Sequence, residues 1–348
     1  MKKKLLSVVL TAVMAASVLT GCGSTDNGTA STAAATGTAQ SEAAATSAAS
    51  TDGKVYNIGI CQLVQHEALD AATQGFKDAI TEELGDKVKF DLQNAQGEQT
   101  TAATICNGFV SDGVDLILAN ATSPLQSAAA ATTTIPILGT SVTDYATALE
   151  ISDWFGATGR NISGTSDFVP PAEQAALIQE LFPDAKKIGM LCCSSEANSQ
   201  YQAEALQKEL ANKGYSYESY LFADSNDLSY AAENAAAECD VIYIPTDNTI
   251  ASCAGLIANI CGAEGLPVIT GEESTCRVCG AATLTVDYYD LGYATGEMAA
   301  RILIDGEDIS TMPIQYASSF TKKYNADILS YYSDKSGRSS VGFRGDRK

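Results

Sequence analysis

The sequence has little of the residues on which most catalytic and metal sites depend. The chain of 348 residues contains one histidine, His66. A single imidazole excludes multi-histidine zinc and iron sites, and any Ser-His-Asp or Cys-His catalysis would have to use His66. Basic residues are also scarce, with 21 Lys and Arg against 42 Asp and Glu and a formal net charge of −21. Because such an acidic surface repels phosphate backbones, we expect no nucleic-acid partner.

Familiar enzyme motifs are absent as well. The chain has no GxSxG nucleophile elbow, no HExxH and no P-loop. We therefore expect a protein that is not an enzyme and that needs neither a metal nor another cofactor. One alternative stays open, a thiol oxidoreductase or local disulfide at Cys276 and Cys279, which form a lone CxxC. The other cysteines lie mostly in apolar runs, as is typical of buried free thiols.

The N-terminus is predicted to be a targeting segment. Three lysines at 2–4 precede an apolar stretch at 5–18 that is too short for a stable transmembrane helix. The stretch ends in Leu-Thr-Gly-Cys at 19–22, which resembles a bacterial lipoprotein box. On that resemblance 1–22 is a lipoprotein signal peptide, Cys22 carries the lipid, and the protein is extracytoplasmic and anchored to the cell membrane. A plain secretory signal is the alternative.

Two further segments are predicted to lie outside the folded domain. Residues 23–54 are almost entirely Ser, Thr, Ala and Gly, which cannot bury enough apolar surface to offset the entropy of ordering. We expect a disordered tether there. The basic residues 335–348 are predicted to form a disordered tail.

The rest of the chain alternates β-branched apolar runs with amphipathic stretches. Strands are predicted at 55–62, 87–96, 113–121 and 135–142, with helices at 67–84, 100–110 and 125–131 between them. The same order then restarts at 172–182 and runs to a strand at 266–273. A strand and long helix at 280–306 and a final strand at 313–325 complete the chain. This pattern predicts an α/β fold of two similar lobes, each with a parallel sheet.

Polar residues follow the predicted strands at their carboxyl ends, where open α/β sheets bind ligands. The clusters are Gln62, Gln65, His66, Asn94, Gln96, Thr122, Ser123, Ser141, Ser194, Ser195, Thr246, Asp247, Asn248, Glu272 and Glu273. Each residue alone also fits an ordinary loop or helix-cap role.

Several segments in order resemble a known family. They include IGICQLVQHEALDAATQGFKDAI, DLILANATSPLQSAA, NISGTSD, VIYIPTDNTIAS and TLTVDYYDLGYATGEMAARIL. From Val55 to about Asp334 the chain resembles the substrate-binding lipoproteins of ABC importers, in the group of the tryptophan-binding (TrpX-like) proteins. The resemblance implies a type I periplasmic-binding-protein fold of two Rossmann-like lobes joined by three crossovers. It places lobe one at 55–162 and 271–306, and lobe two at 163–270 and 307–334.

The resemblance also implies function and partners. The protein is expected to be a monomer that captures a small solute, an aromatic or other amino acid, between two closing lobes. It would deliver that ligand to an ABC permease and, through it, to an ATPase. A sensor that presents ligand to a membrane receptor and a binder of sugars or nucleosides are the alternatives.

Ligand chemistry assigns provisional roles to the polar clusters. A carboxylate needs hydroxyl and N–H donors, which Thr122, Ser123 and Ser141 are placed to supply. An ammonium needs a carboxylate, and Asp247 is the first choice, with Glu272 or Glu273 as alternatives. The remaining predicted ligand-binding residues are Gln65 and His66 beside an aromatic ring, Asn94 and Gln96 on the same wall, Ser195, Glu196, Asn198 and Asn248 in lobe two, and Asp287 between the lobes.

Overall fold

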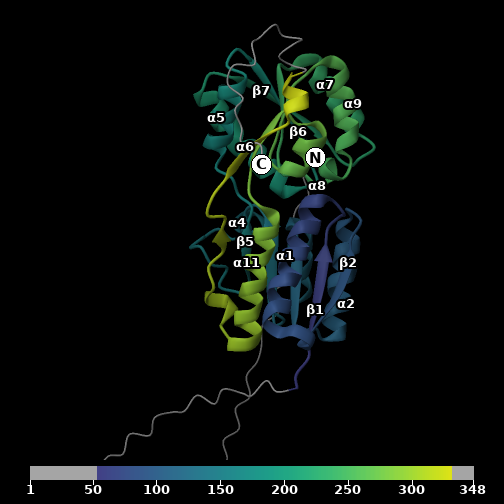
Figure 1. The fold of residues 1–348 in the computed structure, drawn as a ribbon, viewed down its shortest axis with the longest axis vertical. Helices are drawn as coiled ribbons and strands as arrows, with labels where there is room; N and C mark the ends of the chain where they lie inside the picture. The colour runs from purple at the N-terminus through teal and green to yellow at the C-terminus, as the bar shows by residue number, and fades with distance from the viewer. Residues whose placement is uncertain (1–52, 331–348) are drawn as a thin grey trace, which may run out of the picture. The chain divides into compact units, whose positions relative to one another are not determined.

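A computed structural model describes residues 53–330 of the chain (Figure 1). The predicted signal peptide with Cys22, all but the last residues of the tether, and the tail lie outside these residues. Among the helices of the described part, none combines the length and apolar character that a membrane span requires.

The described residues form two six-stranded sheets. Sheet A contains, in spatial order, β11 (Gln315–Tyr316), β5 (Ile162–Ser166), β4 (Ile137–Val142), β3 (Leu116–Asn120), β1 (Tyr56–Gln62) and β2 (Val88–Asn94). Sheet B contains β12 (Thr321–Tyr324), β10 (Ala282–Thr285), β9 (Val268–Thr270), β8 (Val241–Ile244), β6 (Lys187–Cys193) and β7 (Ser216–Phe222). All pairings are parallel except that of β12 with β10. The predicted α/β fold of two lobes is confirmed.

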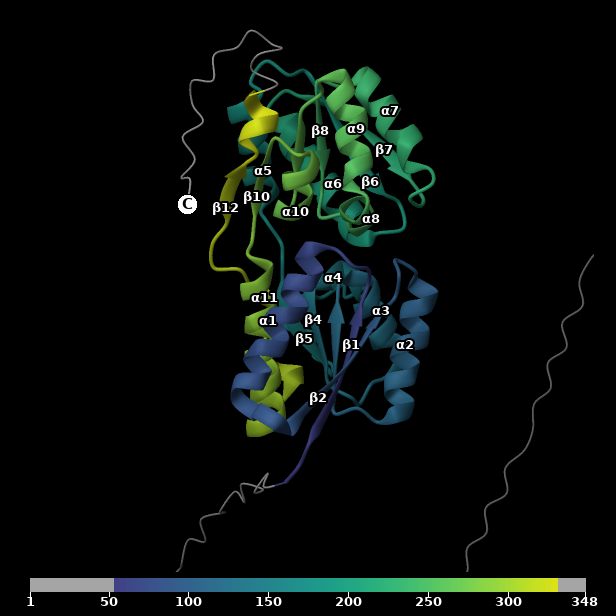
Figure 2. The ribbon, with the colours of Figure 1, turned by 45° about the vertical axis from the view of Figure 1, so that its right-hand side comes forward.

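Helices cover both faces of sheet A. The helices of this lobe are α1 (Glu67–Leu84), α2 (Gln99–Asp112), α3 (Thr122–Ala131), α4 (Tyr145–Ala148) and α11 (Tyr288–Ala300). On one face, Phe76 of α1 and Met298 of α11 share a core with Ile58 of β1. On the other face, Phe109 of α2 and Leu125 of α3 belong to a second core (Figure 2). Both faces of the inner strands β1, β3, β4 and β5 are buried, which explains their continuous apolar runs.

Sheet B repeats this arrangement. Its helices are α5 (Pro171–Leu181), α6 (Ala197–Asn212), α7 (Leu228–Glu238), α8 (Asn248–Ser252), α9 (Ala254–Glu264) and α10 (Glu273–Cys279). Ile178 of α5 and Leu206 of α6 pack with Met190 on one face. Ala232 of α7 and Ile257 of α9 pack on the other. The helical segment between β8 and β9 is divided into two helices, α8 and α9, because the chain turns at Cys253.

Helices α1 and α11 lie side by side although more than 200 residues separate them (Figure 1). Small residues make this possible. A Cβ at Gly292 would collide with the carbonyl oxygen of Ala72, and one at Gly75 would collide with that of Tyr289. Close packing of α11 on α1 therefore assigns α11 to the lobe of sheet A.

The crossovers between the lobes differ from the predicted boundaries. We placed the first crossover at 162/163, but β5 continues in sheet A to Ser166. The segment 271–306 was placed wholly in lobe one, yet β10 pairs with β9 in sheet B and only α11 returns. Sheet membership depends on the strand with which a segment pairs, and a buried apolar run carries no mark of its partner. The described parts are thus 53–166 and 287–316 for lobe one and 168–286 and 317–330 for lobe two, with Asp167 at the first crossover.

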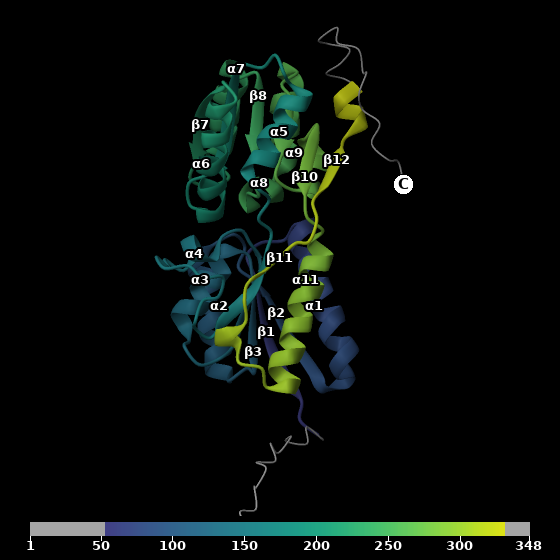
Figure 3. The ribbon, with the colours of Figure 1, turned by 90° about the vertical axis from the view of Figure 1, so that its left-hand side faces the viewer.

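The predicted final strand at 313–325 is two strands. β11 pairs with β5 in sheet A, and β12 pairs with β10 in sheet B. The chain between them, residues 317–320, is the third crossover (Figure 3). The third boundary therefore lies near 317 and not at 306/307.

Candidate functional site

A pocket lies where the two lobes meet, at the carboxyl ends of β1, β4, β5, β8 and β9. Its lining comes from both lobes: His66, Leu69, Ser141, Asp167, Thr246, Asp247, Asn248, Ala251, Glu272 and Tyr288. The empty space among them is about 270 Å³, which includes the part that is open to solvent. Of the predicted site residues, His66, Ser141, Asp247 and Asn248 are brought together here.

Ser141 brings an unused hydroxyl to this pocket. It lies in β4, where the pairing with β5 shifts register between Gly139 and Val142. Its φ of 55° is in the left-handed region, which disfavours a residue with a Cβ. The side chain is 7% exposed, and its Oγ has no hydrogen-bond partner among the described residues. A buried hydroxyl without a partner is costly, so a ligand oxygen or N–H group would stabilise it.

Two more unused hydroxyls lie in the first turn of α3. Thr122 and Ser123 begin this helix, and neither hydroxyl has a partner within residues 53–330. The preceding residue, Ala121, has a φ of 99° and provides no side-chain cap. The helix N-terminus is therefore an uncapped group of donors beside the strand that carries Ser141. These two residues are not among those that line the pocket itself.

Asp167 is a pocket residue that the sequence analysis missed. Its carboxylate accepts hydrogen bonds from the Thr143 hydroxyl at 2.8 Å and the Tyr288 hydroxyl at 2.8 Å. The side chain is 4% exposed, and burial raises the pKa of this carboxyl. Asp167 and Tyr288 stand at the first and second crossovers, so their bond joins two of the connections between the lobes. The signal was present, since Asp167 ends the segment NISGTSD directly after a strand.

Asp247 lies in the pocket as predicted, and it also caps a helix. One carboxylate oxygen accepts from the backbone N–H of Ile250 at 2.9 Å, which caps α8. The other accepts from the N–H of Cys193 at 2.6 Å. Burial and the nearby Glu196 carboxylate raise the pKa of Asp247. Both of its roles, ligand wall and helix cap, are therefore compatible with its position.

Glu196 and Asn198 are buried beside this pocket but do not line it. Glu196 accepts from the backbone N–H groups of Asn248 and Thr249 at 3.0 and 2.8 Å, and from both of their side chains. Asn198 donates to the carbonyl oxygen of Thr246 at 2.7 Å. Both residues therefore support the loop that carries Thr246, Asp247 and Asn248.

Two adjacent glutamates at the start of α10, Glu272 and Glu273, have different surroundings that the sequence could not distinguish. Glu272 is buried in the pocket wall and caps α10 through the backbone N–H groups of Ser274 and Thr275, both at 2.6 Å. Glu273, which was predicted to bind ligand, does not line this pocket and forms ion pairs with Arg277 and Lys323. It lines a neighbouring hollow instead of the pocket.

The sequence matches the model of a known protein family. The family model described as ABC transporter substrate binding protein matches residues 57–331. The chain belongs to the ABC transporter substrate-binding proteins. The family predicted from the sequence is thereby confirmed, and this family consists of solute-binding proteins and not of enzymes.

Relatives of this substrate-binding protein extend along nearly the whole chain. The tyrosine-binding protein of Clostridioides difficile (strain R20291) is 35% identical over 331 residues, which are 94% of this chain and 91% of the relative. A Streptococcus ABC domain solved in complex with L-Trp is 31% identical at a TM-score of 0.77, covering 80% of this chain and 95% of that one. The ligand-free, open structure of a Clostridium difficile substrate-binding protein with adhesive properties is 35% identical at a TM-score of 0.63, covering 83% and 97%.

Other predicted site residues of the substrate-binding protein lie outside the pocket. Gln65 and Ser195 are exposed. Asn94 and Gln96 form a local turn, in which the Asn94 side chain accepts from the Gln96 backbone N–H at 2.7 Å. Asp287 is exposed and caps α11. A position after a strand is shared by ligand residues and turn residues, so the sequence alone did not separate them.

The two cysteines of the CxxC lie on the buried face of α10. Cys276 and Cys279 are buried and free, and the other cysteines of the described residues are also free. Burial raises the pKa of Cys276 to about 12 and raises that of Cys279 well above its usual value. Since the thiolate is the reactive form, this environment does not favour thiol exchange at neutral pH. The outer face of α10 carries Arg277 and Val278 instead.

Proposed function

We propose that this ABC transporter substrate-binding protein captures an aromatic L-amino acid between its lobes and presents it to a membrane permease. The observation that carries the proposal is the composition of the pocket, where buried carboxylates, an unused hydroxyl and apolar side chains meet. A zwitterion with an apolar side chain matches that composition. The ligands for which the two relatives are named, tyrosine and L-Trp, support an aromatic side chain.

The ammonium of the ligand is assigned to Asp167. Its two oxygens accept hydrogen bonds from the side-chain hydroxyls of Thr143 and Tyr288, and a carboxylate can accept about four hydrogen bonds. Asp247 is second choice, because both of its oxygens are engaged by backbone N–H groups. An ammonium beside Asp167 would also offset the cost of burying that carboxylate.

The carboxylate of the ligand is assigned to Ser141 and the N-terminus of α3. Ser141 contributes a buried hydroxyl without a partner, and Thr122 and Ser123 add two more at the helix end. Helix N-termini favour anions because their backbone N–H groups are unpaired and the helix dipole is positive there. The side chain of the ligand would then lie toward Leu69 and Ala251, the two aliphatic residues of the lining.

The family supports a location outside the cytoplasm, and the lipoprotein-like N-terminal segment supports a lipid anchor. We propose that the protein works outside the cytoplasmic membrane and is held there by lipid at Cys22. More than one acyl chain makes such an anchor stable. A permease and an ATPase complete the proposed transporter, and the receptor acts as a monomer.

A binding screen of the ligand-stripped protein tests this proposal. The panel contains the twenty amino acids, common sugars and nucleosides. At a hundredfold excess over Kd, a ligand should add about 2.7 kcal/mol of stability and raise Tm by several degrees. We expect shifts with L-Tyr, L-Trp or L-Phe. A shift with a sugar or nucleoside alone, or none at all, would contradict the proposal.

Two analogues of L-Tyr test the assignments of the ligand carboxylate and the ligand ammonium. Tyramine lacks the carboxylate, and 3-(4-hydroxyphenyl)propionate lacks the ammonium. Both should bind far more weakly than L-Tyr, since each leaves one set of buried polar groups unpaired. Equal binding of tyramine would remove Ser141 and α3 from the site, and equal binding of the propionate would remove Asp167.

A further inference from the structure

We propose that His66 selects ligands whose aromatic side chain carries a hydrogen-bond donor, and that a chain of contacts from lobe two sets the proton position of its ring. This inference rests on the proposed function and names the specificity of the same pocket. In the proposed complex, His66 Nδ1 accepts a hydrogen bond from a phenol O–H or an indole N–H of the ligand.

The chain of contacts begins at Glu196. Its carboxylate accepts from the Asn248 side-chain N–H at 2.7 Å and from the Asn248 backbone N–H at 3.0 Å. Because a carboxylate accepts but does not donate, the amide nitrogen of Asn248 must point toward Glu196. The amide oxygen of Asn248 is thereby turned toward lobe one.

That oxygen fixes the ring of His66. His66 Nε2 lies 3.1 Å from Asn248 Oδ1. An amide oxygen accepts, so Nε2 must carry the hydrogen, and in the neutral imidazole Nδ1 is then an acceptor. Hydrogen bonds from lobe two thus assign the tautomer of His66, which belongs to lobe one.

His66 Nδ1 is the last atom in this series of contacts. The atom is buried and has no hydrogen-bond partner within residues 53–330. His66 occupies the cap position of α1, yet its side chain accepts from no N–H of the first turn. His66 also lines the pocket. A buried acceptor on a pocket residue calls for a donor from the ligand.

The surroundings of His66 suit an aromatic side chain better than an ammonium. Leu69 stands one turn along α1 from His66, and Ala251 one turn along α8 from Asn248, so an apolar residue lies beside each member of the pair. The buried carboxylates Asp167 and Glu272 follow β5 and β9, farther along each sheet toward β11 and β12. They are the better ammonium partners, which leaves His66 to the side chain.

The consequence is a preference among aromatic amino acids. L-Tyr and L-Trp carry a donor on the ring and L-Phe does not. L-Phe would leave Nδ1 buried and unpaired. A site built to hydrogen-bond a substrate group rejects an analogue that lacks the group more strongly than it rejects a small change in size.

Calorimetric titration of the ligand-stripped protein with L-Tyr, L-Trp and L-Phe tests the inference in three variants. His66→Leu should weaken L-Tyr and L-Trp by about tenfold and leave L-Phe within about twofold. His66→Gln offers a donor to Asn248 and an acceptor to the ligand, so it should restore part of the preference. Gln74→Ala, at an exposed site on α1, is the matched control and should change nothing.

Nitrogen NMR gives a second readout that does not depend on affinity. His66 is the only histidine of the chain, so its ring nitrogens give unique signals if no histidine tag is added. We expect the Nε2–H tautomer, with the Nδ1 signal shifted by L-Tyr or L-Trp and much less by L-Phe.

The outcomes separate this inference from the proposed function. If the protein binds none of the three amino acids, the proposed function fails and this inference falls with it. If it binds them but His66→Leu weakens all three equally, or none, only the inference is overturned. An Nδ1–H tautomer or a doubly protonated ring in the complex would also overturn it.

Discussion

The two lobes bring polar residues to the pocket in different states. In lobe one, the Ser141 hydroxyl and the His66 Nδ1 atom are buried and have no partner among the described residues. In lobe two, Asp247 and Glu272 have both carboxylate oxygens bound to backbone or side-chain groups of their own lobe. Lobe one therefore offers unused hydrogen-bonding capacity, whereas the acids of lobe two hold their own helices in place.

The difference teaches how to separate binding residues from scaffold residues in such a pocket. Lining the pocket is not sufficient, because Asp247 and Ser141 do so equally. The state of their hydrogen bonds distinguishes them, since a satisfied group gains little from a ligand and an unsatisfied one gains much. Changes in lobe one should then lower affinity, and changes in lobe two should lower stability.

The largest effect on affinity is expected from Asp167→Asn. The change removes the proposed ammonium partner and keeps the size of the side chain. Hydrogen bonds to charged groups contribute about 1.5–3 kcal/mol, so affinity for L-Tyr should fall by roughly 10- to 100-fold. Calorimetry on the variant measures this, with circular dichroism as the control for folding. An unchanged Kd would move the ammonium to another carboxylate.

Asp247→Asn should instead act mainly on stability. It weakens the cap of α8 and the bond to the Cys193 N–H, and caps contribute about 0.5–2 kcal/mol. Urea denaturation should show a loss of that order, with Kd changed less than by Asp167→Asn. If the two variants lose affinity equally, the contrast between the lobes is wrong.

The same variant has a pH signature. Because burial and Glu196 raise the pKa of Asp247, the folded protein holds this proton more tightly than the unfolded chain does. The stability that this protonation contributes is present below about pH 4, where the unfolded carboxyl ionises, and is lost as the pH rises through the raised folded pKa. Asp247→Asn lacks this contribution. The stability difference between the wild type and the variant should therefore be larger at pH 5 than at pH 7.

Ser141→Gly should separate the effect of backbone strain on stability from the effect of the Ser141 hydroxyl on ligand binding. Glycine adopts a positive φ without steric cost, so the free energy of unfolding should rise by about 1 kcal/mol. Loss of the hydroxyl should weaken L-Tyr binding by roughly three- to tenfold. Ser141→Ala is the matched control, because it loses the hydroxyl and keeps the strain. Denaturation and calorimetry on both variants measure the two effects, and a Gly variant that binds normally would exclude the hydroxyl from the site.

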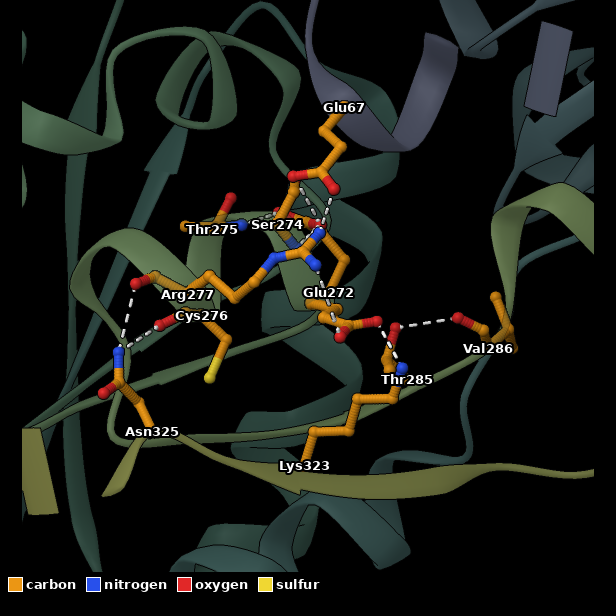
Figure 4. A network of polar contacts seen from close by, with 11 residues as sticks. Glu67, Glu272, Ser274, Thr275, Cys276, Arg277, Thr285, Val286, Lys323 and Asn325 are labelled. Carbon is orange, nitrogen blue, oxygen red and sulfur yellow. Dashed lines mark hydrogen bonds and ion pairs between the residues drawn. The ribbon is translucent and has the colours of Figure 1, made fainter. Parts of the chain in front are cut away.

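The smallest effect is expected from the ion pair that joins the lobes outside the pocket. Arg277 of α10 pairs with Glu67 in the first turn of α1, and their side chains are 52% and 62% exposed (Figure 4). Exposed pairs contribute roughly 0.2–1 kcal/mol, so Glu67→Gln should weaken ligand binding by less than about fivefold, and less still in high salt. Glu83→Gln, elsewhere on α1, is the control. A tenfold loss would make this contact a major part of the closed state.

Sequence patterns predicted most elements but not their partners. The helix predicted at 67–84 has those bounds in the structure, and the strand predicted at 135–142 is found at 137–142. The segment 313–325 appeared as one strand and is two, in different sheets, because strand pairing is a long-range property. Likewise, His66, Ser141, Asp247 and Asn248 were predicted for the site and line the pocket, whereas Gln65 and Asn94 share the same local pattern and do not.

The sequence by itself determined the class of the molecule. Two runs of alternating apolar strands and amphipathic helices, an acidic composition and an ordered set of family motifs required a two-lobed α/β binding protein. Only the tertiary structure decided which polar residues are available to a ligand. Ser141 and Asp247 are equivalent in the sequence, as polar residues at strand ends. They differ because hydrogen-bond partners come from residues distant in the chain, and burial makes every unpaired group costly.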